Sequence, residues 1–119
     1  MRDMSWEEKL LCLQGLGETS LRMREPGNWY VDARRRDCIR GIFAVGAYGN
    51  GNTPQAAVEA DWAIISKEPC VRAGDAHYTW NGSMWDRLTD SEVATRRELH
   101  PEVAENKRAA AAYVAQKKP

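Results

Sequence analysis

Hydrophobic side chains at helical spacing identify the first element of the chain. Ser5 is followed three residues later by Glu8, a capping box in which each side chain pairs with a free backbone N–H at the start of a helix. Gly15 and Gly17 mark the end of that helix, because glycine readily adopts the left-handed conformation found at helix C-termini. The apolar stripe between these signals consists of Trp6, Leu10, Leu11 and Leu13.

The period of the hydrophobic pattern changes at Trp29. Residues 18–28 are polar and contain Pro26-Gly27, so they are predicted to form a connection. From 29 to 34 apolar and polar residues alternate, as in a half-buried strand. Residues 35–37 are all charged and are predicted to form a turn.

A second strand and a second helix are predicted over residues 38–66. Apolar residues alternate over 38–48, and two glycines there disfavour a helix. The Gly-Asn-Gly-Asn sequence at 49–52 predicts a turn, after which Thr53 caps a helix with Pro54 at its first position. The predicted core face of this helix consists of Ala57, Val58, Ile64 and Ile65.

A β-hairpin is predicted in the second half of the chain. Aromatic and apolar residues at 77–80 and 84–88 flank Asn81-Gly82. This dipeptide predicts a two-residue type I′ turn, because both residues accept positive φ. Thr89 and Glu92 then form another capping box, which starts a helix.

The C-terminal part of the chain is predicted to be helical. His100-Pro101 interrupts the helix, and residues 104–118 are rich in alanine with a basic end. The order is therefore helix, strand, strand, helix, hairpin and helices. We predict an α+β fold with a small antiparallel sheet packed by helices, as a single domain over 1–119 in which 89–119 is a helical C-terminal extension.

Composition and charge argue against several classes of protein. The 119 residues include 17 Lys and Arg and 17 Asp and Glu, so the formal net charge is zero. Hydrophobic residues make up 43%, and no apolar run is long enough to cross a bilayer, which argues against a disordered polymer and a membrane protein. The acidic residues among positions 1–10 are unlike the apolar core of a signal peptide, so we expect a cytoplasmic protein with no membrane partner.

The cysteine and histidine residues show no pattern of a disulfide framework, a metal site or a catalytic thiol. Cys12, Cys38 and Cys70 are odd in number and far apart, so we expect them to be reduced and unbridged. Together with His77 and His100 they lack the spacing of zinc ligands. We therefore expect no metal and no cofactor, and the sequence favours a binding protein over an enzyme.

Two stretches of the sequence carry a resemblance to a group of proteins. GNGNTPQAAVEADW at 49–62 and YTWNGSMW at 78–85 resemble small, mostly uncharacterised accessory proteins of tailed bacteriophages. In that group a strand ends in a glycine turn, a TP-initiated helix follows, and a WNG-x-MW hairpin comes later. The resemblance covers about residues 29–85. It implies an α+β core and a phage-type protein acting in the bacterial host cytoplasm, with counter-defence as the favoured role, and it implies no mechanism.

The first of these stretches, taken alone, is also similar to HicB-type antitoxins. The shared pattern is the strand-to-helix junction, with a glycine turn, a Thr helix start and an Ala-rich helix. Trp62 and the later hairpin are not features of that family. This second resemblance implies an antitoxin or a regulator.

Four arginines form the sharpest charged feature of the sequence. A planar guanidinium can hold a phosphate through two hydrogen bonds, which suits a nucleotide or a nucleic acid. The alternative is a solvated turn that Asp32 and Asp37 partly neutralise. Zero net charge argues against general coating of DNA, but a localised phosphate site is compatible with it. The four candidates are Arg34, Arg35, Arg36 and Arg40.

Three aromatic residues on predicted strands are candidates for stacking on a ligand. Aromatic side chains on a sheet can stack on nucleic-acid bases or on the ring of a nucleotide. The alternative is that they belong to the core. Trp80 and Trp85 are an odd number of positions apart, so unless the turn resets the facing, one is expected to be buried and the other accessible. The third candidate is Tyr48.

These features favour a non-enzymatic, phage-type accessory protein that binds a host protein or a phosphate-bearing ligand, either a nucleotide or a nucleic acid. One alternative is a HicB-like antitoxin or regulator. Another is a metal-dependent enzyme acting on nucleic acid or nucleotides, with metal ligands among Glu59, Asp61, Asp75 and Asp86. Sheet edges without proline and a tail with little apolar surface also predict a homo-oligomer, in the simplest case a dimer formed through an edge strand or the C-terminal helices.

Overall fold

Helices and antiparallel strands form an α+β fold, which the computed structural model describes over residues 3–41 and 43–99. The helices in this part of the chain are α1 (Trp6–Gln14), α2 (Pro54–Ile65), α3 (Asp90–Arg96) and the 3₁₀ helix η1 (Arg97–Leu99). The strands are β1 (Thr19–Glu25), β2 (Asn28–Ala33), β3 (Arg36–Arg40), β4 (Phe43–Gly46), β5 (Gly49–Gly51), β6 (Val71–Ala73), β7 (Ala76–Trp80) and β8 (Trp85–Arg87). They form two antiparallel sheets in place of the single small sheet expected.

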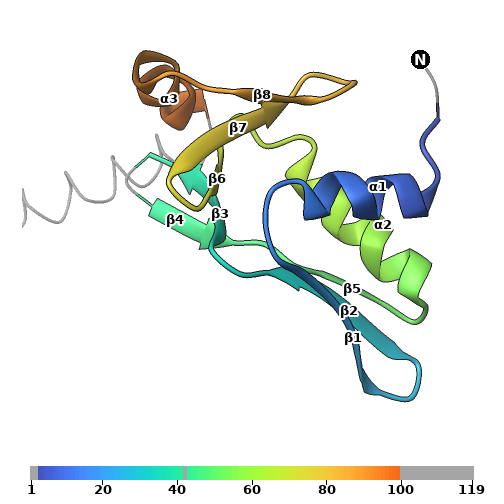
Figure 1. Ribbon diagram of the computed structural model, residues 1–119. Coiled ribbons are helices and arrows are strands. Elements are labelled where there is room, and N and C mark those ends of the chain that lie inside the picture. The colour runs from blue at the N-terminus through green and yellow to red at the C-terminus, as the bar shows by residue number, and fades with distance from the viewer. Residues whose placement is uncertain (1–2, 42, 100–119) are drawn as a thin grey trace, which may run out of the picture.

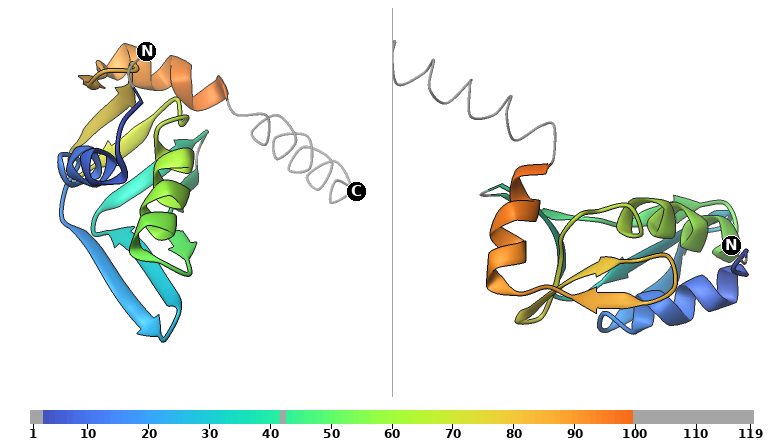
Figure 2. Two further views of the ribbon diagram at one scale, coloured as in Figure 1. Left: turned by 90° about the vertical axis from the view of Figure 1, so that its right-hand side faces the viewer. Right: turned by 90° about the horizontal axis from the view of Figure 1, so that it is seen from above.

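The two sheets share one core beneath the helices. The three-stranded sheet has the order β1-β2-β5, and the five-stranded sheet has the order β4-β3-β6-β7-β8. Helix α2 packs on the three-stranded sheet with α1 beside it, while α3 lies at the far end of the molecule from the β1–β2 hairpin (Figures 1 and 2). The fully buried core side chains include Leu13, Val31, Cys38, Val58, Ile65 and Val71.

Strand β1 occupies most of the segment that was predicted to be a connection, so that prediction is wrong. Pro26-Gly27 forms the turn of a hairpin, with Gly27 at φ 76°, and Leu21 pairs with Val31 across it. Leu21 is half-buried, whereas the side chains of residues 22–25 are exposed. With only one apolar position facing the core, this edge strand shows only a short alternation of apolar and polar residues, which is a weak signal for a strand.

Strand β5 replaces the turn predicted at 49–52. Gly49 pairs with Val31 and Gly51 pairs with Trp29, so this glycine-rich segment completes the three-stranded sheet. Helix α2 explains its composition. A Cβ on Gly49 would overlap the carbonyl oxygen of Ala57, and one on Gly51 would lie 2.6 Å from the backbone nitrogen of Ala57.

The single strand predicted over 38–48 is a hairpin of two strands. Arg40 pairs with Phe43, and between them Gly41 adopts φ 63°, a conformation that favours glycine. The charged turn predicted at 35–37 is also shorter than expected. Only Arg34 and Arg35 lie in the turn, because β3 begins at Arg36.

The hairpin predicted around Asn81-Gly82 is confirmed, but its loop is longer than expected. Trp80 pairs with Trp85, so the loop contains four residues, 81–84. The side-chain oxygen of Asn81 accepts hydrogen bonds from the backbone N–H groups of Ser83 and Met84, at 2.8 and 2.9 Å. This Asx turn is the alternative use of asparagine in turns. Strand β6, which pairs with β3 and β7, was not predicted.

The predicted helix starts are confirmed. Ser5, Thr53 and Thr89 are the N-caps of α1, α2 and α3, and each side chain accepts a backbone N–H three residues later. The core face of α2 differs at one position, since Ile64 is 38% exposed. The predictions for His100-Pro101 and for residues 104–118 lie outside the described residues.

Three tryptophans from α2 and the β7–β8 hairpin pack against one another edge to face. The ring centroids of Trp62 and Trp80 are 4.8 Å apart, those of Trp80 and Trp85 are 5.0 Å apart, and those of Trp62 and Trp85 are 5.9 Å apart. The indole N–H of Trp85 donates to the backbone carbonyl of Cys12 at 2.8 Å, which joins α1 to the cluster. The expectation that one of Trp80 and Trp85 is buried and the other accessible is wrong, because both pack in this cluster.

Candidate ligand-binding cleft

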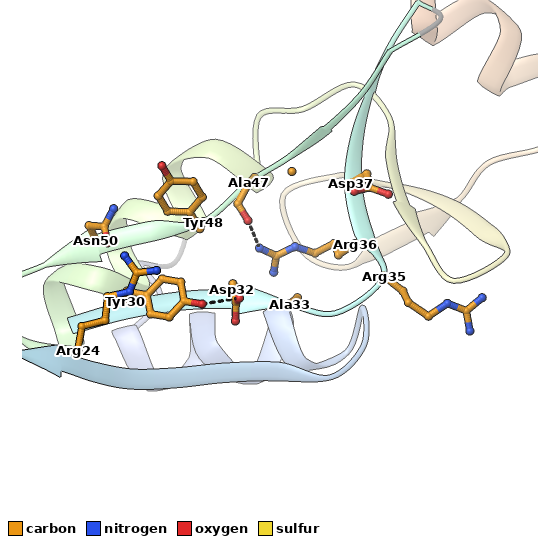
Figure 3. Close-up of a pocket in the computed structure, with 11 residues that line it drawn as sticks. Arg24, Tyr30, Asp32, Ala33, Arg35, Arg36, Asp37, Ala47, Tyr48 and Asn50 are labelled. Atoms are coloured by element: carbon orange, nitrogen blue, oxygen red, sulfur yellow. Dashed lines mark hydrogen bonds between the residues drawn. The ribbon is translucent and has the colours of Figure 1, made fainter. Parts of the chain in front are cut away.

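A cleft of about 550 Å³ opens where two strands of the three-stranded sheet separate (Figure 3). Strands β2 and β5 are paired only as far as Val31 and Gly49. Beyond this pair, β2 continues to Ala33 while the other segment runs through Tyr48 and Ala47 to the five-stranded sheet. The cleft is the wedge between them. Its lining includes Arg24, Tyr30, Asp32, Arg36, Tyr48 and Asn50.

The inner wall of the cleft carries a buried arginine with unused hydrogen-bond donors. The side chain of Arg36 is fully buried, and its Nη2 donates to both carboxylate oxygens of Asp61, at 2.8 and 2.9 Å, and to the carbonyl oxygen of Ala47 at 3.2 Å. Its Nε and Nη1 have no hydrogen-bond partner among the described residues. Figure 3 shows this guanidinium directed between Asp32 and Ala47. Buried donors without a partner are uncommon, because leaving them unpaired costs free energy.

Asp61 is the buried counter-charge of Arg36. It projects from α2, between the core residues Val58 and Trp62 of the same helix. Burial raises the pKa of Asp61 above its ordinary value of 3.8, the charge and hydrogen bonds of Arg36 act against this rise, and the charge of Asp32 adds to it. The carboxyl group therefore takes up a proton at higher pH in the folded chain than in the unfolded chain.

This raised pKa predicts a specific pH dependence of stability. The contribution of Asp61 to the free energy of unfolding is fully present below about pH 3.8 and is lost as the pH rises through the folded-state pKa. The stability of the wild type should therefore increase relative to that of Asp61→Asn as the pH is lowered from about 7 to about 4. Urea unfolding of both proteins across this range measures the difference. A difference that shrinks on acidification contradicts the prediction.

Aromatic rings and a cation form the outer part of the cleft. The rings of Tyr30 and Tyr48 meet edge to face with centroids 6.5 Å apart, and Tyr48 is 57% exposed. The guanidinium carbon of Arg24 lies 4.6 Å from the centroid of the Tyr30 ring. The hydroxyl group of Tyr30 donates to Asp32 at 2.7 Å, which holds the ring in place. Arg24 and the exposed face of Tyr48 thus lie at one rim (Figure 3).

The structure brings together only part of the predicted site. Arg36 and Tyr48 line the cleft, and Arg35 lies at its end with its side chain pointing away from Arg36 (Figure 3). Arg35 adopts φ 59° in the turn, and its guanidinium is 3.6 Å from the exposed carboxylate of Asp75.

The other predicted binding residues lie elsewhere. Arg34 is exposed and lines two neighbouring hollows instead of the cleft. Arg40, at the opposite end of β3, forms an ion pair of 2.6 Å with the buried Glu68. Trp80 and Trp85 belong to the tryptophan cluster. The structure therefore does not bring the four arginines to one site, since Arg36 is buried and Arg40 is ion-paired.

Sequence reasoning missed Arg24, Tyr30 and Asp32. Arg24 belongs to the segment predicted as a connection, and Tyr30 and Asp32 were assigned only to the polar face of a strand. The available signal was the alternation of Leu21 and Met23 with Arg22 and Arg24 immediately before the Pro-Gly turn. With that hairpin in place, the polar faces of β1 and β2 become neighbours, and Arg22 pairs with Tyr30 across them.

The described part of the chain contains neither a group of possible metal ligands nor a reactive thiol. Within residues 3–41 and 43–99, no three His, Cys, Asp or Glu residues are grouped so that they could hold a metal ion. The three cysteines are unbridged. Burial raises the pKa of all three thiols, and that of Cys38 reaches about 12, so they are protonated at neutral pH and are poor nucleophiles.

Comparison of the chain with protein families, with curated proteins and with solved structures finds no match in any of the three. Among the described residues, no helix has both the length and the apolar character needed to span a bilayer. A functional assignment for the cleft therefore depends on its own geometry.

Proposed function

We propose that the chain is a non-enzymatic binding protein whose cleft holds a phosphate-bearing ligand with an aromatic ring, as in a nucleotide. The observation that carries this proposal is the buried Arg36, whose Nε and Nη1 have no partner among the described residues at the wall of an open cleft. Both nitrogens are buried, so an acceptor oxygen of a ligand would reach and satisfy them by displacing part of the cleft lining. Hydrogen bonds to a charged donor are among the stronger ones that proteins make.

The charge at the rim supports an anionic ligand. Arg24 is exposed, and it is held over the ring of Tyr30 instead of being paired with a carboxylate in any ion pair of the described residues. Of the two aspartates in the lining, Asp37 forms an ion pair with Arg72, and Asp32 accepts from Tyr30. The positive charge of Arg24 is thus the least compensated charge beside the cleft.

The aromatic rim supports a ligand that also carries a ring. The exposed face of Tyr48 offers a stacking surface, and stacking of a base on an aromatic side chain contributes about 1 to 3 kcal/mol. Asn50 lies beside Tyr48 and has an amide that can both donate and accept hydrogen bonds. The cleft volume of about 550 Å³ lies within the range of small-molecule sites.

The cellular role in this proposal is that of a phage-type accessory protein in the cytoplasm of a bacterial host, with counter-defence as its form. Withholding a phosphate-bearing ligand from host proteins would be one such action. This role rests on the resemblance of residues 49–62 and 78–85 to phage accessory proteins.

Binding of adenosine 5′-monophosphate, compared with adenosine and with inorganic phosphate, tests the proposal. By calorimetry, the nucleotide should bind more tightly than either part alone. Arg24→Ala should weaken binding and flatten its salt dependence, because it removes one cation near the phosphate. Tyr48→Ala should cost about 1 to 3 kcal/mol with little change in the salt slope.

Arg34→Ala is the matched control for these variants. Arg34 is exposed, as Arg24 is, but lies outside the cleft, so its removal should leave affinity unchanged. Equal losses in Arg24→Ala and Arg34→Ala would indicate non-specific attraction and would reject the cleft. Failure of the nucleotide and of a short single-stranded oligonucleotide to bind would reject the proposed ligand class.

A further inference from the structure

Strand β4 is an open sheet edge of unusual composition. It pairs with β3 on one side and is the terminal strand of the five-stranded sheet within the described residues. All four of its residues are exposed. Residues 41–58 contain no charged side chain, and the one proline among them is Pro54, outside β4.

The other sheet edges carry features that prevent pairing with another strand. β1 has the charged residues Arg22, Arg24 and Glu25, and β8 has Asp86 and Arg87. β5 is only three residues long and lies against α2, which approaches Gly49 and Gly51 closely. Charged and short edges are the usual protection against edge-to-edge association. Among the described edge strands, β4 combines exposed apolar side chains with the absence of any charged residue.

The apolar side chains of β4 share one face of the sheet. Phe43 is 46% exposed and Val45 is 39% exposed, and they lie opposite Arg40 and Cys38 on β3. Alternate residues of a strand point to the same face. Phe43 and Val45 therefore form a small apolar patch on one face at the edge of the sheet, and Ala44 lies on the opposite face.

We propose that β4 is the interface through which a second copy of this chain binds, by antiparallel pairing of the two β4 strands about a two-fold axis. The absence of charge favours a second copy over a charged partner, since self-pairing brings no like charges together. Symmetry also restricts the register. Opposite residues of an antiparallel pair point to the same face, so residues that pair across the axis must be an even number of positions apart.

Placing Ala44 on the axis satisfies this condition within the four residues of β4. Phe43 of each copy then lies opposite Val45 of the other, which gives two aromatic to β-branched pairs of the kind that stabilise sheets. The two five-stranded sheets become one continuous sheet. Because the contact is short compared with stable dimer interfaces, the dimer is weak and depends on concentration.

Cross-linking through Ala44→Cys tests this register. Paired residues on the axis have Cα atoms about 4.5 to 5.5 Å apart, which is within disulfide range. With diamide as the oxidant that accepts the two hydrogens, Ala44→Cys should form a disulfide-linked dimer at a rate well above that of the wild type. Met23→Cys is the matched control, because Met23 is an exposed apolar residue on the charged edge strand β1. Equal rates for the two variants would overturn the proposal.

Sedimentation equilibrium of variants that keep the native cysteines gives a second test. The wild type should shift with concentration from the 13.4 kDa chain mass toward twice that value. Val45→Lys should remain at the chain mass, because it places like charges together at the interface, whereas Met23→Lys should behave as the wild type. A wild type at the chain mass over all concentrations, or a dimer that Val45→Lys leaves intact, would overturn the proposal. Nucleotide binding is measured separately, so either proposal can fail without the other.

Discussion

Asp61→Leu should destabilise the fold by about 3 to 5 kcal/mol, the cost of leaving a buried charge without its partner. The carboxylate of Asp61 accepts two hydrogen bonds from Nη2 of Arg36, and both side chains are fully buried. The guanidinium of arginine stays charged at neutral pH even when it is buried, so the penalty cannot be escaped by loss of a proton. The free energy of unfolding, measured by urea denaturation at neutral pH, gives the loss.

Three further variants separate this charge effect from loss of packing. Arg36→Met combined with Asp61→Leu should recover most of the stability, because apolar pairs of similar volume replace buried ion pairs at little cost. Asp61→Asn should cost less than Asp61→Leu, because its amide oxygen still accepts a hydrogen bond from Arg36, but it should remain destabilising because it does not balance the charge. Asp75→Asn removes an exposed partner of Arg35 and should change stability by less than about 1 kcal/mol. If the double variant is as unstable as Asp61→Leu, the unpaired charge is not the cause.

Gly49→Ala should destabilise the protein by about 3 kcal/mol, at the upper end of the usual range for overpacking. The added Cβ would overlap the carbonyl oxygen of Ala57 and the backbone nitrogen of Asp61, both of which belong to the backbone of α2. A helix backbone cannot rotate away as a side chain can, so either α2 or β5 must shift. Urea denaturation measures the loss.

Gly46→Ala is the matched control for this prediction. Gly46 also lies in a strand close to the cleft, but a Cβ there would meet no atom within 4 Å. Its effect on stability should be within about 0.5 kcal/mol, as for surface positions in general. Similar losses in both variants would show that the close approach of α2 and β5 is not what requires glycine at position 49.

Signals that depend on neighbouring residues predicted much of this fold. The three N-caps and the β7–β8 hairpin follow from side chains within a few positions of one another, and the structure confirms each of them. The strands that were missed depend on distant parts of the chain. β5 is a strand because β2 lies beside it and because α2 leaves no room for side chains, and neither cause is visible in a Gly-Asn-Gly sequence.

In the candidate site, too, the features that depend on single residues could be predicted, whereas those that depend on distant contacts could not. Arg36 and Tyr48 were selected for their chemistry, and the structure places both in the cleft. That Arg36 is buried could not be predicted, because its partner Asp61 is 25 residues away on a helix. Arg24 reaches the cleft only through the β1–β2 pairing, for which the sequence gives only a short alternation before the Pro-Gly turn. Residue types thus indicated the chemistry, and long-range pairing decided which residues meet.

The tryptophan cluster should give the molecule a characteristic circular dichroism signal. Indole rings within about 5 to 6 Å of one another in a fixed edge-to-face arrangement, as Trp62, Trp80 and Trp85 are, couple their electronic transitions and produce a paired circular dichroism band that isolated tryptophans lack. The three rings come from α2 and from both strands of the β7–β8 hairpin, and the hydrogen bond from Trp85 to Cys12 adds α1. A single wavelength therefore reports whether segments distant in sequence remain docked, without any label being attached.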